Sequence, residues 1–112
     1  MPLLAPRRVE REKLVAYLLN KDHQRGHGKA KFFFSCGFSL DHAGVFERAL
    51  LAHAAENDIF ETTQDEFGEK TVVKCSIKTP DGNNPCILTV WRLDLGRATY
   101  RLITAYPTDP TQ

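Results

Sequence analysis

The sequence predicts an α+β fold in which two or three helices come first and a four-stranded antiparallel β-meander follows. Apolar residues between positions 9 and 56 recur at helical spacing, whereas from residue 59 onward β-branched and aromatic residues alternate with a period of two. Short turn-like segments separate the expected strands, and such connections join antiparallel neighbours. Helices followed by a meander are typical of α+β domains, in which the helices cover one face of the sheet.

Two of the expected helices lie in the first third of the chain. The first spans Val9–Leu19, where one stripe is apolar and the charged residues lie outside it. The stripe consists of Val9, Leu14, Tyr17 and Leu18. The second is a short helix at Ala30–Cys36, and Gly37 follows it, where a left-handed backbone commonly ends a helix.

The third helix has the clearest pattern. Ser39 or Asp41 is expected to cap its start, and Asn57 or Asp58 to end it. Its apolar stripe consists of Phe46, Ala49, Leu50, His53 and Ala54. Because His53 lies on this stripe, we expect it to be a hydrogen-bonded residue of the core or of its boundary.

The four expected strands are Ile59–Thr63, Thr71–Lys78, Cys86–Leu93 and Thr99–Tyr106. A turn that contains a glycine separates each expected strand from the next one. Simple alternation in the last strand would place Tyr100, Leu102, Thr104 and Tyr106 in one row and the intervening residues in the other. Apolar residues occur in both rows, so the pattern leaves open which face is exposed.

A chain of 112 residues is long enough for one hydrophobic core. We expect residues 1–8 to be a flexible arm, residues 9–107 to be a single domain, and residues 108–112 to be a disordered tail. No stretch approaches the roughly 20 apolar residues of a membrane span, and no signal-peptide pattern is present, so a cytoplasmic location is expected. The three cysteines form no CxxC pair, which favours reduced thiols over a disulfide framework.

Charge is distributed unevenly although the net charge is only +1. Residues 1–40 carry eight basic and three acidic side chains, residues 41–69 carry one basic and eight acidic, and residues 70–112 carry six basic and three acidic. This asymmetry is compatible with one basic and one acidic surface, or with ordinary solvated faces.

The glycine-rich segment RGHGKAKFFF, residues 25–34, is the first candidate site. Arg25, Lys29 and Lys31 are candidates for binding phosphate, because cations near a helix start favour anions. His27 is the candidate general acid or base, since imidazole titrates near neutral pH. A basic surface loop would show the same composition. His23 and His27 lack a clear third ligand, so no metal or other cofactor is expected.

The last two strands supply the second candidate group. Arg92, Arg101 and Thr104 are candidates for contacting phosphate or ribose, and Tyr106 is a second candidate catalytic residue. A sheet face that carries aromatic, threonine and arginine side chains suits RNA, because aromatic rings stack on bases and arginine pairs with phosphate. Packing in the core or at a sheet edge explains the aromatic residues equally well.

These segments together resemble a family of small uncharacterised bacterial proteins. Its members have a helix that ends in YLLN, then an H-x-x-G-x-x-KA-x-FF run, then a TVW strand and finally a TAYP strand. Residues 12–107 follow this pattern, including YLLNKDHQRGHGKAKFFF, TVW and TAYP. The order of elements is also similar to that of the barnase, colicin and RelE-like ribonucleases, many of which are toxins. This second resemblance implies metal-independent cleavage by the RNA 2′-hydroxyl, although the Glu/Arg/His set of barnase has no match in this sequence.

Two functions are left open by the sequence. One is a non-catalytic interaction module, or a component of a toxin–antitoxin-like pair, that binds a small neighbouring protein. The alternative is a metal-independent ribonuclease of toxin type that acts on RNA. Neither function involves a membrane. A ribonuclease requires His27 and Lys29 to lie close to Arg92, Arg101, Thr104 or Tyr106, so spatial proximity distinguishes the two.

Overall fold

A computed structural model describes residues 1–20 and 27–109 of the chain. In chain order the elements are β1 (Arg7–Arg8), α1 (Arg11–Lys13), the π-helical segment η1 (Leu14–Leu18), α2 (His27–Ser35), the 3-10 turn η2 (Leu40–His42), α3 (Ala43–Glu56), β2 (Ile59–Asp65), β3 (Gly68–Ser76), β4 (Cys86–Asp94) and β5 (Tyr100–Pro107). None of the described helices is both long and apolar enough to cross a membrane. The α+β class predicted from the sequence is confirmed.

The sheet has five strands in the order β1-β5-β4-β3-β2, and it is mixed rather than purely antiparallel. Strands β2 to β5 form the expected antiparallel meander, but β1 adds a parallel pair with β5, in which Arg7 lies opposite Tyr100. The prediction of four strands is therefore wrong by one. A two-residue strand is too short to show periodicity, and its pairing partner lies at the other end of the chain.

Part of residues 1–8, the segment predicted to be a flexible arm, makes contacts with the rest of the domain. Leu3 is buried in the core, and its backbone N–H donates to the carbonyl of Ala54 over 3.0 Å. The carbonyl of Pro6 accepts a 2.8 Å hydrogen bond from the Tyr100 N–H. Burial of Leu3 and these backbone bonds hold the segment along the sheet.

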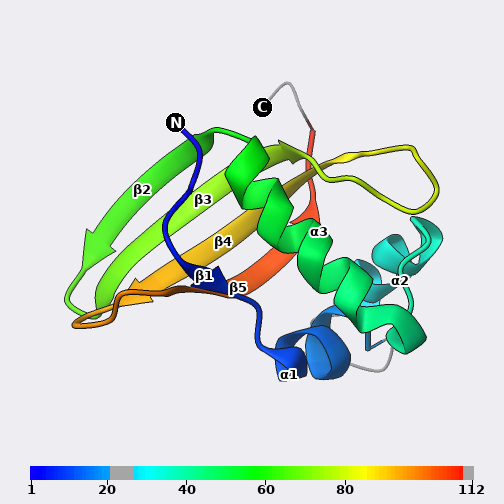
Figure 1. The fold of residues 1–112 in the computed structure, drawn as a ribbon, viewed down its shortest axis with the longest axis horizontal. Coiled ribbons are helices and arrows are strands. Elements are labelled where there is room, and N and C mark those ends of the chain that lie inside the picture. Colours follow the sequence, from blue (N-terminus) through cyan, green and yellow to red (C-terminus); the bar gives the residue numbers. More distant parts are fainter. Residues whose placement is uncertain (21–26, 110–112) are drawn as a thin grey trace.

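The hydrophobic core lies between α3 and the sheet. Figure 1 shows α3 lying across one face of the sheet, with α1 and α2 gathered at the end opposite the β4–β5 turn. On α3, Phe46 and Leu50 are fully buried, as are Trp91 and Leu102 of the sheet. The buried α3 residues are Ala43, Phe46, Leu50, His53 and Ala54. The apolar stripe predicted for this helix is confirmed, apart from Ala49, which is only half-buried.

The first residues of the two N-terminal helices differ more from the predicted positions than their last residues do. The helix expected at Val9–Leu19 begins at Arg11 and widens to π-helical geometry, and the helix expected from Ala30 begins at His27. Gly37 has a φ of +101°, as expected for a residue that ends a helix. A Cβ atom at this position would lie 2.9 Å from the Cβ of Pro80, so lack of space also favours glycine.

His53 is a buried member of a hydrogen-bonded network, as predicted. Its Nε2 lies 2.9 Å from the Cys75 carbonyl oxygen, which can only accept, so Nε2 carries the proton. Nδ1 is then an acceptor for the Thr89 hydroxyl at 3.1 Å, and Thr89 in turn accepts from the Trp91 indole N–H at 2.8 Å. The network joins α3 to β3 and β4 with a neutral imidazole.

This network makes stability depend on pH. Burial lowers the pKa of His53, although the Cys75 carbonyl and Glu56 favour the charged form. Below pH ~6.5 the unfolded chain therefore binds a proton that the folded protein resists, and the free energy of unfolding falls by up to about 1.4 kcal/mol per pH unit. We expect His53→Gln to reduce the difference in stability between pH 7.5 and pH 5.5, measured by urea unfolding. An unchanged difference would contradict this assignment.

A β-bulge in β5 determines which residues of this strand lie on each face of the sheet. Trp91 pairs with Leu102 but Val90 pairs with Thr104, so Ile103 is the extra residue. Leu102 and Ala105 are consequently both fully buried under the helices, and the single row from Tyr100 to Tyr106 expected from simple alternation does not exist. Thr104 and Tyr106 lie on the opposite face, which we call the outer face.

Gly68, at the turn between β2 and β3, has no room for a side chain. Its φ is +140°, and a Cβ atom would lie 2.1 Å from the carbonyl oxygen of Leu93. We expect Gly68→Ala to destabilise the protein by several kcal/mol, because left-handed strain of about 1–2 kcal/mol is added to a backbone clash. Gly82 is the matched control, since its φ is +79° but nothing lies within 4 Å of its Cβ position. Equal losses of thermal stability in the two variants would contradict the role of the clash.

The end of β5 lies beside two cysteines. Thr108 donates its N–H to the Cys86 carbonyl at 3.1 Å, whereas residues 110–112 of the expected tail lie outside the described residues. Cys75 and Cys86 are free thiols on the adjacent strands β3 and β4. Burial, together with the neighbouring Cys75 thiol, raises the pKa of Cys86 to about 12, so this thiol is protonated at neutral pH.

Candidate functional site

A cluster of hydroxyl groups and cations lies where η1 and α2 meet the outer edge of β5. The Tyr17 hydroxyl lies 3.1 Å from the Thr104 hydroxyl, and the Lys29 ammonium donates a hydrogen bond to the same Tyr17 oxygen. The short strand β1 pairs only with Tyr100 and Arg101 of β5. Among the described residues, no strand pairs with the rest of that edge, and the helices contact it directly. We call the group the tyrosine–lysine cluster. Its members are Lys13, Tyr17, Lys29, Thr104 and Tyr106.

Aromatic rings surround the ammonium group of Lys29. Its Nζ lies 4.8 Å from the centre of the Tyr17 ring and 6.0 Å from the centre of the Tyr106 ring, distances at which a cation is attracted to a π-face. Lys13 Nζ lies 5.2 Å from the centre of the same Tyr17 ring. Two cations thus share one tyrosine, while Tyr106 remains 37% exposed.

The surroundings of Tyr17 change its acidity. Burial alone would raise the pKa of this hydroxyl, but the hydrogen bonds with Lys29 and Thr104 and the charges of Lys29 and Lys13 outweigh it. The pKa of Tyr17 therefore lies below the ordinary tyrosine value. A tyrosine with a lowered pKa gives up its proton more readily, which is the property required of a general acid.

The two lysines of α2 differ in what they contact. Lys29 is half-buried and bonded to Tyr17, whereas Lys31 is exposed. Two residues along an α-helix correspond to a rotation of about 200°, so the two side chains leave the helix on nearly opposite sides. Lys31, predicted to bind phosphate, is not part of the cluster.

Arg92 and Arg101 lie on the outer face, one row away from Thr104, and both are paired with carboxylates. Arg92 donates to Asp65 at 2.8 Å, and Arg101 donates to Asp94 at 2.7 Å. The hydrogen bond from Arg101 is the main reason that the pKa of Asp94 lies below its ordinary value. The positive charges of both arginines are thus largely neutralised within the protein, which weakens them as phosphate ligands.

Two predicted site residues remain, His27 and Arg25. His27 is the first residue of α2, so its backbone is two residues from Lys29. Arg25 lies outside the described residues. The structure therefore brings Lys29, Thr104 and Tyr106 together.

Tyr17 belongs to the candidate site, although the sequence pattern predicts for it only a place on an apolar helix stripe. It was expected on an apolar helix stripe, and its ring does pack against the core. Its hydroxyl, however, extends to β5, which is remote in sequence. The signal that could have identified it is the phenolic group itself, because a tyrosine on a buried stripe needs a partner for its O–H.

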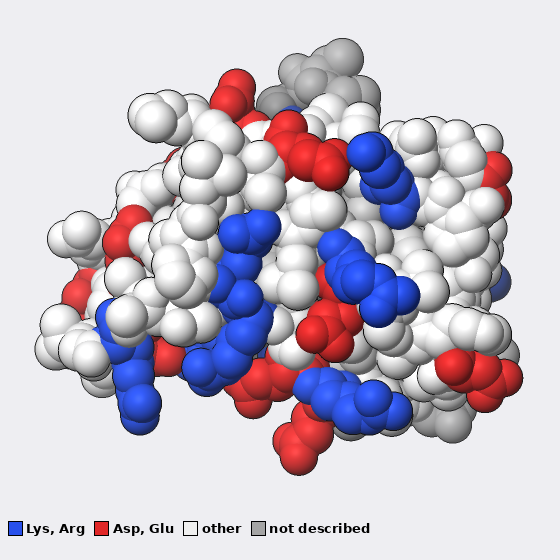
Figure 2. Space-filling view, in the orientation of Figure 1, with Lys and Arg blue, Asp and Glu red and all other residues white. Residues whose placement is uncertain are grey.

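Charge elsewhere on the molecule is mixed. On the face drawn in Figure 2, Lys and Arg side chains lie in separate places with Asp and Glu between them, so this face is not of one sign.

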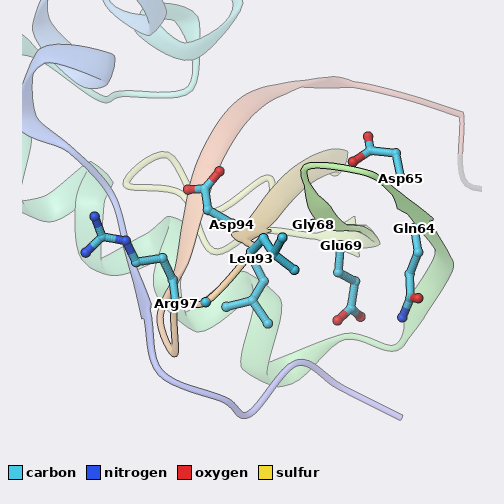
Figure 3. A pocket seen from close by; sticks show the side chains of 9 residues that line it. Gln64, Asp65, Gly68, Glu69, Leu93, Asp94 and Arg97 are labelled. Carbon is cyan, nitrogen blue, oxygen red and sulfur yellow. The ribbon is translucent and has the colours of Figure 1, made fainter.

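An open hollow of about 210 Å³ lies at the turns that join β2 to β3 and β4 to β5. Figure 3 shows Asp65, Glu69, Asp94 and Arg97 around it. This acidic hollow lies at the end of the sheet away from α2 (Figure 1).

The described residues contain no group of three or more His, Cys, Asp or Glu side chains placed to hold a metal ion. In the tyrosine–lysine cluster, the Tyr17 phenol is hydrogen-bonded to the Lys29 ammonium on one side and to the Thr104 hydroxyl on the other. Such a set can neutralise charge on a phosphate and transfer a proton beside it.

Comparison with known proteins places the chain in a family and shows that its fold is similar to that of a solved structure. A family model described as a domain of unknown function (DUF6883) matches residues 5–109. No curated protein matches the chain. The fold is similar to a chain of a contact-dependent growth inhibition toxin–immunity protein complex from Klebsiella pneumoniae 342, with a TM-score of 0.71 and 15% sequence identity. The similarity covers 89% of this chain and 98% of that chain.

Proposed function

The chain belongs to the DUF6883 family, and we propose that it is a metal-independent ribonuclease of toxin type that a small protein partner holds in check. The single observation that supports this most is the hydrogen-bonded series Lys29–Tyr17–Thr104 at the edge of β5. It offers a fixed cation, a proton donor and a polar positioning group without a metal. The exposed ring of Tyr106 beside Lys29 adds a surface on which a base can stack.

The proposed reaction uses the RNA 2′-hydroxyl as its nucleophile. A base removes the proton from this hydroxyl, the 2′-oxygen forms a bond to phosphorus, and the bond from phosphorus to the 5′-oxygen breaks. His27 is the proposed base. Lys29 stabilises the negative charge that develops on the phosphoryl oxygens, and Tyr17 gives its proton to the departing 5′-oxygen. The products are a 2′,3′-cyclic phosphate and a free 5′-hydroxyl.

The structural neighbour supports the second half of the proposal. That protein is part of a toxin–immunity protein complex, and the same backbone arrangement in this chain is compatible with either role in such a pair. A nuclease that attacks cellular RNA requires an inhibitor in the cell that makes it. We therefore propose a small neighbouring protein as the partner of this chain, in addition to RNA as its substrate.

The proposal is tested by incubating the purified chain of 112 residues with total RNA in the presence of EDTA. Wild-type protein and Lys31→Ala should cleave the RNA, while His27→Ala should be inactive. Fragments should end in 2′,3′-cyclic phosphates. If the wild-type protein is folded and leaves RNA intact, the ribonuclease proposal is rejected.

A non-catalytic interaction module is the second candidate, and the acidic hollow is the observation that favours it. Phe67 and Leu95 are 64% and 78% exposed on the adjoining turns, beside Asp65, Glu69 and Asp94. Exposed apolar side chains that lie on adjoining turns suit contact with another protein. Intact RNA in the preceding experiment would favour this module.

A further inference from the structure

The outer face of the sheet carries a row of side chains that begins at the tyrosine–lysine cluster. Across the strands, Tyr106 of β5 lies opposite Leu88 of β4, and Leu88 lies opposite Lys74 of β3. Thr71, Val73 and Thr89 are buried under the helices, so Lys74 and Leu88 alternate onto the outer face. These three residues therefore form one line across three strands.

At each end of this line, an exposed aromatic ring lies next to a lysine. At the β5 end, Lys29 Nζ lies 6.0 Å from the centre of the Tyr106 ring. At the β2 end, Lys74 Nζ lies 5.0 Å from the centre of the Phe60 ring, and that ring is 57% exposed. Phe60 sits at the register shift between Ile59 and Glu61, which explains how an apolar ring of the edge strand reaches Lys74.

We propose that this row binds a segment of single-stranded RNA that extends from the cleavage site across β4 and β3 to Phe60. The inference rests on the proposed ribonuclease function and adds a second binding subsite to it. Bases stack on Tyr106 and Phe60, Lys74 contacts a phosphate between them, and Leu88 supplies apolar contact. Aromatic platforms combined with cations are the general means by which proteins bind single strands.

The next two rows along the strands are less suited to a phosphate backbone than the row from Tyr106 to Phe60. The next row along the strands runs from Thr104 through Val90 and Val72 to Glu61, which repels phosphate. The row after that contains Lys70, Arg92 and Arg101, and the two arginines in it are paired with Asp65 and Asp94. The row from Tyr106 to Phe60 contains Lys74 and no carboxylate, and Lys29 lies beside its Tyr106 end.

The length of the row fits a short stretch of RNA. Adjacent strands lie about 4.8 Å apart, so the row from β5 to β2 spans about 14 Å. Four-stranded sheets that bind RNA through aromatic residues stack about two or three bases. We therefore expect the row to hold a few nucleotides on one side of the scissile phosphate.

Affinity for a 2′-O-methyl oligonucleotide of eight nucleotides, which cannot be cleaved, tests the row. Phe60→Ala should weaken binding about 5- to 100-fold, the effect of losing one stacked base. Phe67→Ala is the matched control, because Phe67 is similarly exposed but lies on the β2–β3 turn, away from the row. Equal affinities of Phe60→Ala and wild-type protein would overturn the proposal.

The salt dependence of the same binding tests Lys74. Lys74→Gln should reduce the slope of log affinity against log salt by about 1, since one phosphate contact is lost. Lys78→Gln should leave the slope unchanged, because Lys78 pairs with Glu56 at 3.6 Å instead. A slope unchanged by Lys74→Gln would contradict the phosphate contact.

The outcome for this row can be separated from the outcome for the proposed function. A dinucleotide that occupies only the tyrosine–lysine cluster should be cleaved equally fast by Phe60→Ala and wild-type protein. If the dinucleotide is cleaved while Phe60→Ala has unchanged affinity for the oligonucleotide, the row is rejected and the ribonuclease remains. If Phe60→Ala weakens oligonucleotide binding but no RNA is cleaved, the row is supported as an RNA-binding surface and the ribonuclease is rejected.

Discussion

Lys29→Ala is expected to lower the rate of RNA cleavage by about 10²–10³-fold, the usual effect of removing one group that stabilises transition-state charge. Lys29 donates to Tyr17 and lies near both tyrosine rings, so its loss removes the cation that would face the phosphate. It also removes a main cause of the lowered pKa of Tyr17. Cleavage of a dinucleotide substrate by purified variants measures the effect.

Lys31→Ala is the matched control for Lys29→Ala. Both variants remove one positive charge from α2, but Lys31 is exposed and does not contact the tyrosine–lysine cluster. Its cleavage rate should stay within a factor of a few of the wild-type rate. If both variants lose activity to the same extent, the effect comes from net charge, and the proposed role of Lys29 is wrong.

Leu50→Asp is expected to unfold the protein. Leu50 is fully buried on α3, where the substitution removes apolar contacts and buries a carboxylate. These two effects together exceed about 5 kcal/mol, which is comparable to the whole stability of a small domain. Circular dichroism should show loss of the cooperative thermal transition at neutral pH.

Val45→Asp provides the comparison on the same helix. Val45 is 38% exposed, so a carboxylate at this position remains hydrated. The melting temperature of this variant should change by only a few degrees. A stable, cooperatively folded Leu50→Asp protein would mean that α3 does not bury this face.

Most of the meander and the long helix could be predicted from the sequence because local pattern determines them. The stripe through Phe46 and Leu50 marks the buried side of α3, and turn-forming glycines mark the ends of the strands. The parallel strand β1 could not be predicted, since two residues carry no period and their partner, Tyr100, is remote in sequence. The bulge at Ile103 was missed for a related reason, because register depends on both strands.

The candidate site was predictable in part. Lys29, Thr104 and Tyr106 were identified from their chemistry, whereas their convergence depends on how α2 docks against the free edge of β5. Tyr17 was assigned to packing, and its second role depends on a hydrogen bond across the fold. Arg92 and Arg101 were identified for their charge, but the nearby Asp65 and Asp94 that pair with them could not be placed from spacing alone.

The measurement that tests the central claim most directly is cleavage of an RNA oligonucleotide by Tyr17→Phe in the presence of EDTA. This substitution removes one oxygen atom and the proton that the proposed mechanism transfers to the 5′-oxygen. We expect a rate about 10²–10⁴-fold below that of the wild-type protein, with the melting temperature changed by only a few degrees. A Tyr17→Phe protein that cleaves RNA at the wild-type rate would contradict the assignment of this cluster as the catalytic site.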